Sequence, residues 1–193
     1  MKTDKRVCVI LNGPPGAGKD TIAQLLVKEH GFAQCENKTP LHQLGAILHG
    51  SDPAEWVRLY NGRDFKEAKN ESLGGMSPRE LYIWLSEEVI KPKFGKNWFG
   101  RMSARHARMT GRDVVFSDGG FQPEYEALQD AFGVENVLLV HLFRPGFSFD
   151  GDSRNYLKPA GSPYLALELH DGAPDHARQS IMVTVAAMDG RKA

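Results

Sequence analysis

A glycine-rich segment near the N-terminus limits the folds open to this chain more than any other feature. Gly13, Gly18 and Lys19 form the pattern G-x-x-x-x-G-K directly after an apolar run at 7–11, and a helix-like segment at 21–26 follows. Strand, glycine loop and helix together bind phosphate, because successive backbone N–H groups turn toward the ligand and the helix N-terminus adds positive charge. The sequence therefore predicts a site for a nucleoside triphosphate.

The expected phosphate-binding loop comprises Gly13, Pro14, Pro15, Gly16, Ala17, Gly18, Lys19, Asp20 and Thr21. Lys19 is placed to reach the terminal phosphates. Asp20 occupies the position where this pattern usually has a Ser or Thr whose hydroxyl binds Mg²⁺. The Asp20 carboxylate or the Thr21 hydroxyl can serve instead, because Mg²⁺ takes oxygen ligands and keeps several waters. Both residues stay open as magnesium ligands.

Length and composition place few further limits on the chain. Its 193 residues suit a single domain, and we expect residues 1–193 to form one kinase domain. The formal net charge is zero, which marks neither a nucleic-acid binder nor a membrane binder. The charged start at 1–6 indicates no signal peptide, and no apolar run has membrane-spanning length. Cys8 and Cys35 are isolated, as in reduced proteins, so a cytoplasmic location is expected.

Apolar runs alternate with helix-like segments along most of the chain. Strands are expected at 7–11, 32–35, 114–116, 137–143 and 165–169, and helices at 21–30, 40–48, 53–60, 78–91, 97–109, 123–132 and 174–188. Ser77, Pro78 and Glu80 are typical of a capped helix start. Near-continuously apolar strands that alternate with helices predict an α/β fold, with a parallel β-sheet flanked by helices on both faces.

Two charged residues follow strands of this sheet where the strands end. Asp118 comes after strand 114–116, and Arg144 comes after strand 137–143. Ligands of such sheets bind beyond the carboxyl ends of the strands, so the glycine loop, Asp118 and Arg144 are expected along one rim. A carboxylate there can hold Mg²⁺ or accept a proton from an attacking hydroxyl, and an arginine can neutralise the transferring group. The alternative for Asp118 is a turn residue in Asp-Gly-Gly.

The polar segment 146–163 is expected to be a loop that serves as a lid or contacts the acceptor. It carries Arg154, which is a second candidate for charge neutralisation and otherwise a residue of a solvated loop. Glu124 lies near the start of helix 123–132. It is either a site residue or a first-turn carboxylate that interacts with the helix dipole.

Positive charge is concentrated between residues 91 and 112, a segment without Asp or Glu. Arg101, Arg105 and Arg108 share one face of the expected helix by their spacing. Such a face can hold a phosphate-rich acceptor, or it can be an ordinary solvated helix face. The neighbouring Trp98 and Phe99 are expected in the core rather than on a base-stacking surface.

These features together resemble the deoxynucleoside monophosphate kinases of bacteriophages. The resemblance rests on Gly-Lys-Asp-Thr at 18–21, on Ser-Pro-Arg-Glu-Leu at 77–81 leading to Lys-Asn-Trp-Phe at 96–99, on Asp118 and on Arg-Pro-Gly at 144–146. It implies a P-loop kinase of nucleoside monophosphate kinase-like architecture, with ATP as donor and Mg²⁺ as metal. It also implies that Lys19 binds the phosphates, that Asp118 serves the magnesium ion or the acceptor, and that Arg144 contacts the transferring group.

One position departs from that family. The family has Asp-x-Arg after the strand, whereas this chain has Asp118-Gly119-Gly120. The chain also resembles phage kinases that phosphorylate 5-hydroxymethyl-deoxyuridine within DNA. Such an acceptor needs an open site and a basic track, which Gly119-Gly120 and the segment 91–112 are expected to provide. This DNA modification activity, in the host cytoplasm if the protein is phage-encoded, is the favoured expectation. A kinase of free deoxynucleoside monophosphates is the alternative, and a nucleotide-binding switch without catalysis is a third. The oligomeric state stays open.

Overall fold

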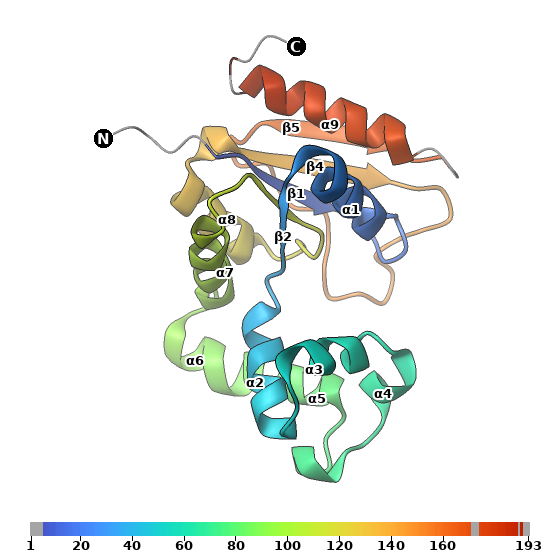
Figure 1. Ribbon diagram of the computed structural model, residues 1–193, viewed down its shortest axis with the longest axis vertical. Coiled ribbons are helices and arrows are strands. Elements are labelled where there is room, and N and C mark those ends of the chain that lie inside the picture. The colour runs from blue at the N-terminus through green and yellow to red at the C-terminus, as the bar shows by residue number, and fades with distance from the viewer. Residues whose placement is uncertain (1–5, 171–173, 189, 191–193) are drawn as a thin grey trace. The chain divides into compact units, whose positions relative to one another are not determined.

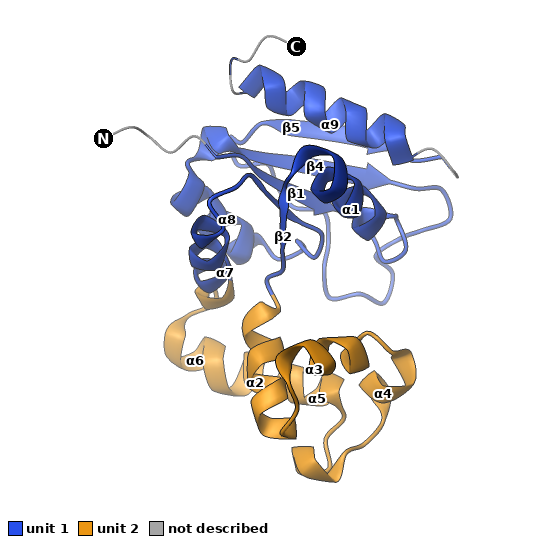
Figure 2. Cartoon of the chain, viewed as in Figure 1, with its two compact units in different colours: residues 1–37, 100–193 blue, residues 38–99 orange. Residues whose placement is uncertain are grey.

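A computed structural model describes residues 6–170, 174–188 and 190 of the chain (Figure 1). The expectation that the charged N-terminal residues form no signal peptide falls mostly on residues 1–5, which lie outside the described residues. The chain divides into two compact units (Figure 2). Residues 1–37 and 100–193 form unit 1, and residues 38–99 form unit 2.

Unit 1 is built on a parallel five-stranded sheet. The strands are β1 (Cys8–Asn12), β2 (Ala33–Cys35), β3 (Val114–Phe116), β4 (Val137–Phe143) and β5 (Tyr164–Glu168). Their order in the sheet is β2-β3-β1-β4-β5, and every neighbouring pair is parallel. Strand β1 therefore lies at the centre, and all of its residues are buried. This arrangement confirms the predicted parallel α/β sheet.

Helices cover both faces of this sheet (Figure 1). They are α1 (Lys19–His30), α7 (Trp98–Met109), α8 (Gln122–Phe132) and α9 (Pro174–Met188), with a 3₁₀ turn at Val134–Asn136. Alternate residues of β1 point to opposite faces, so Val9 packs with α1 and α9, whereas Ile10 packs with α7 and α8. The two hydrophobic clusters hold the ends of the strands in place, and these ends carry the candidate site.

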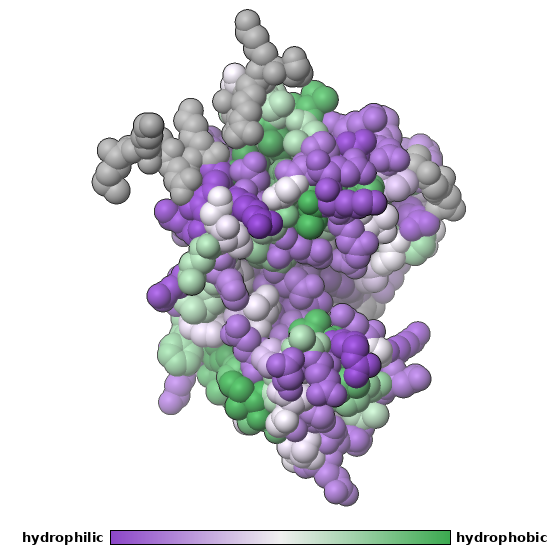
Figure 3. Space-filling model, viewed as in Figure 1, coloured by the Kyte–Doolittle hydropathy of each residue, from purple (hydrophilic) through white to green (hydrophobic). Residues whose placement is uncertain are grey.

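Unit 2 is helical and has a core of its own. Its elements are α2 (Thr39–His49), α3 (Pro53–Tyr60), α4 (Arg63–Glu67), a 3₁₀ turn at Glu71–Leu73, α5 (Pro78–Ile83), a π-helix at Trp84–Ile90 and α6 (Lys91–Phe94). Trp56 is fully buried at its centre and donates from Nε1 to the Tyr82 hydroxyl at 2.7 Å. Hydrophobic side chains reach the surface around α6, where Phe94 is exposed (Figure 3).

The predicted elements agree with the structure except within 61–94. Ser77 and Glu80 form the expected capping box, but the helix widens into π turns at Trp84 instead of running on as an α-helix to Lys91. The wide turns precede Pro92, which lacks an N–H group and whose ring would press on the carbonyl of Glu88 in a regular α-helix. Helix α4 was not predicted, because five residues carry too little periodicity. No helix in the described ranges combines the length and apolarity needed to cross a membrane.

Candidate phosphate-binding site

The loop between β1 and α1 has the backbone that a phosphate-binding loop requires. Gly16 and Gly18 adopt positive φ angles of 79° and 89°, which side chains rarely allow. Gly13 has another constraint, because a Cβ atom there would lie 2.7 Å from the carbonyl oxygen of Leu142. Gly18 is also the N-cap residue of α1, so the positive end of the helix faces the loop.

Lys19 is the best-defined side chain of this loop. It is only 8% exposed, and its Nζ donates to the carbonyl oxygens of Gly13 and Pro14, both at 2.7 Å. Burial, together with the positive charge of Arg154, lowers the pKa of Lys19 to about 8. A phosphate in the loop would offer this ammonium group stronger, charged acceptors than the two carbonyl groups.

Charged residues from helix α1 and from two loops act on Lys19. The negative charges of Asp20, Asp152 and Asp118 act on it and favour its protonated form, against the effect of Arg154. Asp118 is half-buried after β3, and its Oδ1 accepts from the backbone N–H of Asn37 at 3.1 Å. The structure thus brings Lys19, Asp20, Asp118 and Arg154 into one electrostatic cluster. All four were predicted as site residues.

Arg154 is held by an ion pair that the sequence did not reveal. Its Nε and Nη2 donate to the two carboxylate oxygens of Asp152 at 2.9 and 2.6 Å. This pair raises the pKa of Arg154 and lowers the pKa of Asp152 to about 2. Asp152 lies two residues from Arg154, so only its spacing could have identified it as a partner.

The two glycines after Asp118 are packed closely. A Cβ atom at Gly119 would lie 2.6 Å from Cγ2 of Ile10, and one at Gly120 would lie 2.6 Å from Cδ of Arg154. The expectation that these glycines open the site is therefore wrong. Glycine is needed at residue 120 because the stem of Arg154 passes directly over it. Residue 154 therefore places an arginine beside residue 120, where the related kinases have an arginine in the chain itself.

Arg144 also lies at the loop, as predicted. Its Nη1 donates to the carbonyl oxygen of Gly16 at 2.8 Å, and its guanidinium lies 4.6 Å from the centre of the Phe147 ring. That ring covers Gly16, where a Cβ atom would be 2.5 Å from Cε1 of Phe147. Arg144 and Phe147 therefore form a stacked pair on the phosphate-binding loop.

Asn12 organises the loops around the site and was not predicted. Its Nδ2 donates to the carbonyl oxygens of Gly119 and Asn155 at 3.1 and 3.2 Å, and its Oδ1 accepts from the N–H of Leu157 at 2.9 Å. A buried asparagine at the end of an apolar strand was the signal in the sequence, because a buried amide needs partners. Asn12 fixes the segment after Arg154 to the central strand.

The segment 146–163, predicted as a loop, contains no helix or strand. Its second half is anchored on α8, where the Tyr125 hydroxyl donates to the carbonyl of Pro159 at 2.6 Å and Nε2 of Gln129 donates to Oγ of Ser162 at 2.8 Å. Its role as a lid or an acceptor loop stays a prediction.

The carboxylates at the site suit a magnesium ion bound mainly by phosphate and water. No group of three His, Cys, Asp or Glu side chains that could hold a metal occurs among the described residues. Mg²⁺ in phosphate-transferring sites usually has one or two protein carboxylates as ligands and takes the rest from substrate and water. Asp20, which is exposed, and Asp118 can supply these oxygens, and the exposed Thr21 hydroxyl is the alternative to Asp20.

The arginines of α7 line a groove of about 540 Å³ on unit 1, together with Arg6 and residues of α8. Arg101, Arg105 and Arg108 share one face, as predicted. Arg108 donates to the carbonyl of Ala131 at 3.0 Å, and Arg6 donates to the carbonyl of Arg108 at 2.5 Å. Arg108 and Arg6 thus bind carbonyl groups near helix ends, and Arg101 and Arg105 line the same groove.

Glu124 lies in a first helical turn, and the aromatic pair Trp98 and Phe99 begins α7. Glu124 is buried in the first turn of α8, where its backbone contacts Gly100 of α7 closely. Phe99 is buried in the core of unit 2, and Trp98 packs against that core, as expected.

Among comparisons with known proteins, one solved structure supports the fold. No protein-family model matches the chain, and neither does any curated protein sequence. A sugar kinase from Janibacter sp. HTCC2649, solved without ligand, has a similar structure with a TM-score of 0.51, at 14% identity over 97% of this chain and 99% of that one. A shikimate kinase from Acinetobacter baumannii in complex with shikimate has a TM-score of 0.47 at 15% identity, over 95% of both chains. The likeness to the sugar kinase shows that the chain shares its overall fold.

Proposed function

We propose that this protein is an ATP-dependent phosphotransferase. One observation carries the proposal: the buried ammonium group of Lys19 lies in a glycine loop at a helix N-terminus, under the charges of Asp20, Asp118, Asp152 and Arg154. Phosphoryl transfer needs this combination, because the protein must hold a polyphosphate, bind its metal and neutralise developing charge. A loop that only binds a nucleotide would need to hold the polyphosphate and would not need to neutralise developing charge.

Each residue has a defined part in such a reaction. Backbone N–H groups of the loop and Lys19 hold the phosphates of ATP, and Asp20 or Thr21 with Asp118 holds the magnesium ion. Bound Mg²⁺ supplies charge neutralisation on the phosphate oxygens. Asp118 can also accept the proton of the attacking hydroxyl, and Arg154 and Arg144 stabilise charge on the transferring group.

The acceptor we propose is a deoxynucleotide, favoured as the 5-hydroxymethyl group of 5-hydroxymethyl-deoxyuridine in phage DNA. The groove on α7 supports this choice, because Arg101 and Arg105 lie where a strand's phosphates could contact them. A second candidate, the free deoxynucleoside monophosphate, is favoured by Arg154, whose stem lies against Gly120, the position where the related kinases have an arginine.

The deciding experiment is transfer of the γ-phosphate from ATP with Mg²⁺, offered in parallel to free deoxynucleoside monophosphates and to DNA containing 5-hydroxymethyluracil. Label in DNA alone supports the modification kinase, and label in diphosphates alone supports the second candidate. Asp118→Asn should lose rate by orders of magnitude while ATP still binds. ATP binding without transfer to either acceptor would instead favour a nucleotide switch and refute the proposal.

A further inference from the structure

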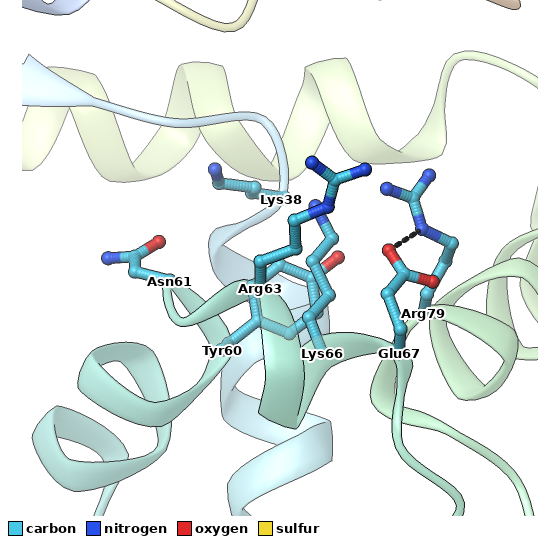
Figure 4. Close-up of a pocket in the computed structure, with 7 residues that line it drawn as sticks. All are labelled: Lys38, Tyr60, Asn61, Arg63, Lys66, Glu67 and Arg79. Atoms are coloured by element: carbon cyan, nitrogen blue, oxygen red, sulfur yellow. Dashed lines mark hydrogen bonds and ion pairs between the residues drawn. The ribbon is translucent and has the colours of Figure 1, made fainter.

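Unit 2 contains a pocket of about 400 Å³ that the proposed chemistry does not use (Figure 4). It is lined by Lys38, Tyr60, Asn61, Arg63, Lys66, Glu67 and Arg79. Its volume is within the range of small-molecule sites, which is about 300–1,000 Å³. Every one of these residues belongs to unit 2, so the pocket is complete within one compact unit.

Positive charge dominates this pocket. Four basic side chains, Lys38, Arg63, Lys66 and Arg79, extend toward the same side, against one carboxylate (Figure 4). They come from separate elements, because Lys38 is the N-cap residue of α2, Arg63 and Lys66 lie on α4, and Arg79 lies on α5. A single solvated helix face would not collect charge in this way.

The surrounding contacts orient these groups. Oε1 of Glu67 accepts from Nε of Arg79 at 2.7 Å, so that the guanidinium edge carrying the Nη atoms stays directed away from the carboxylate. Nζ of Lys66 lies 4.9 Å from the centre of the Tyr60 ring. Burial raises the pKa of Tyr60 to about 12, which keeps its hydroxyl protonated and adds no negative charge.

Four basic side chains against one carboxylate give the pocket a net positive charge, which attracts an anion. A phosphate group fits best, because its oxygens accept from guanidinium and ammonium groups together. The N-terminus of α2, with Lys38 as N-cap and no side-chain cap, adds partial positive charge on the same side. The space left beside a phosphate is enough for more of the molecule that carries it.

We propose that this pocket binds a phosphate group of the acceptor nucleotide. The identity of the ligand rests on the proposed function, since a kinase of nucleotides must recognise the phosphate that its acceptor already carries. The shared chemistry is a phosphate, which belongs either to a free nucleoside monophosphate or to the backbone of DNA.

Binding without ATP tests this inference separately from catalysis. The probes are dTMP, thymidine and a single-stranded oligonucleotide that contains 5-hydroxymethyluracil and ends in a 5′-hydroxyl, each titrated calorimetrically into the full chain. We expect Arg63→Gln with Lys66→Gln to weaken binding about a hundredfold, because each lost charged contact costs roughly tenfold. Loss of dTMP binding identifies a monophosphate as the ligand, and loss of oligonucleotide binding identifies a backbone phosphate.

The control is Arg58→Gln with Lys93→Gln, which removes the same charge from exposed positions of unit 2 outside the pocket. It should bind like the parent. Equal affinity of the pocket variant and the parent for both phosphate probes, or equal loss in the control, would overturn the inference. If the pocket variant does not fold, amide chemical shifts of the unaltered protein decide: dTMP or the oligonucleotide, but not thymidine, must perturb residues 61–67 and 79.

Lys19→Ala separates this inference from the proposed function. It should lose phosphoryl transfer and still bind the acceptor, because Lys19 belongs to unit 1. If the unaltered protein transfers phosphate to no acceptor but its pocket still binds phosphate, the proposed kinase activity is wrong and the pocket inference stands. Transfer that persists with unchanged acceptor KM in the pocket variant counts against the pocket alone.

Discussion

At the residue scale, Lys19 carries a charge that its surroundings disfavour. Its pKa in the folded protein is about 8, against 10.5 when exposed. The unfolded chain therefore binds more protons between pH 8 and 10.5, and the cost of burying this charge disappears as the pH rises through that window. A bound triphosphate has the opposite effect on Lys19, because its negative charge stabilises the protonated form of the side chain.

We therefore expect the affinity for ATP to fall above pH 8, by up to about tenfold per pH unit. Calorimetric titration of the nucleotide between pH 7 and 9.5 measures this. Lys19→Arg is the control, since a guanidinium stays charged throughout and should bind with little pH dependence. Constant affinity of the unaltered protein across this range would show that the charge of Lys19 is not used.

The close packing of Gly120 against Arg154 gives a second prediction at the level of single residues, which concerns catalytic rate. Gly120→Ala would place a Cβ atom within 3 Å of Cβ, Cγ and Cδ of Arg154. We expect the arginine to be displaced and kcat to fall by about tenfold to a hundredfold, with little change in ATP affinity. Steady-state kinetics check this.

Arg154→Gly supplies the matched comparison, because it removes Cβ, Cγ and Cδ together. Adding Gly120→Ala to it should then cost little further activity, which a double-mutant cycle measures as a large coupling between the two positions. Additive losses would mean that Gly120 acts independently of Arg154.

At the scale of elements, α7 and α8 cross at a glycine. A Cβ atom at Gly100 would lie 2.6 Å from Cα and 2.7 Å from the carbonyl oxygen of Glu124. Helix propensity alone predicts that Gly100→Ala stabilises the protein by about 1 kcal/mol. Because backbone atoms cannot yield as a flexible side chain does, we expect destabilisation by about 1–3 kcal/mol. Urea unfolding gives the sign, and a stabilised variant would show that the helices separate easily.

A second prediction for an element concerns DNA binding by the basic face of α7. Arg101→Glu with Arg105→Glu leaves the carbonyl contacts of Arg108 and Arg6 in place. If DNA is the acceptor, this change should weaken oligonucleotide binding and flatten its salt dependence, with dTMP unaffected. Titration at several salt concentrations tests it, with Arg58→Glu as a control on unit 2. Unchanged DNA binding would reduce this face to a solvated surface.

At the scale of the whole molecule, two units with separate hydrophobic cores lie in one chain. Ligand binding to a native unit stabilises that unit first. A non-hydrolysable ATP analogue with Mg²⁺ should therefore slow amide hydrogen exchange in β1 and α1 more than around Trp56 in unit 2. Hydrogen exchange followed by mass spectrometry measures both regions. Equal protection of both would mean that the units unfold as one.

Local sequence was enough to predict the phosphate-binding loop, the strands and most helices. Their signals lie within a few residues of each other: glycines with positive φ, apolar runs, and the capping box of Ser77 and Glu80. Asp118 and Arg144 followed from the same logic, since parallel strands end at one edge of the sheet.

The contacts of the remaining residues depend on how whole elements pack in three dimensions. Asn12 meets Leu157, Gly120 meets Arg154, and Lys38 shares a pocket with Arg79, although these partners lie far apart in the chain. Local propensity carries no record of such pairings, because they arise from packing of whole elements. Local patterns in the sequence thus specify a parallel α/β protein with a phosphate-binding loop. The folded chain decided that Gly120 makes room for an arginine and that unit 2 collects four cations in one pocket.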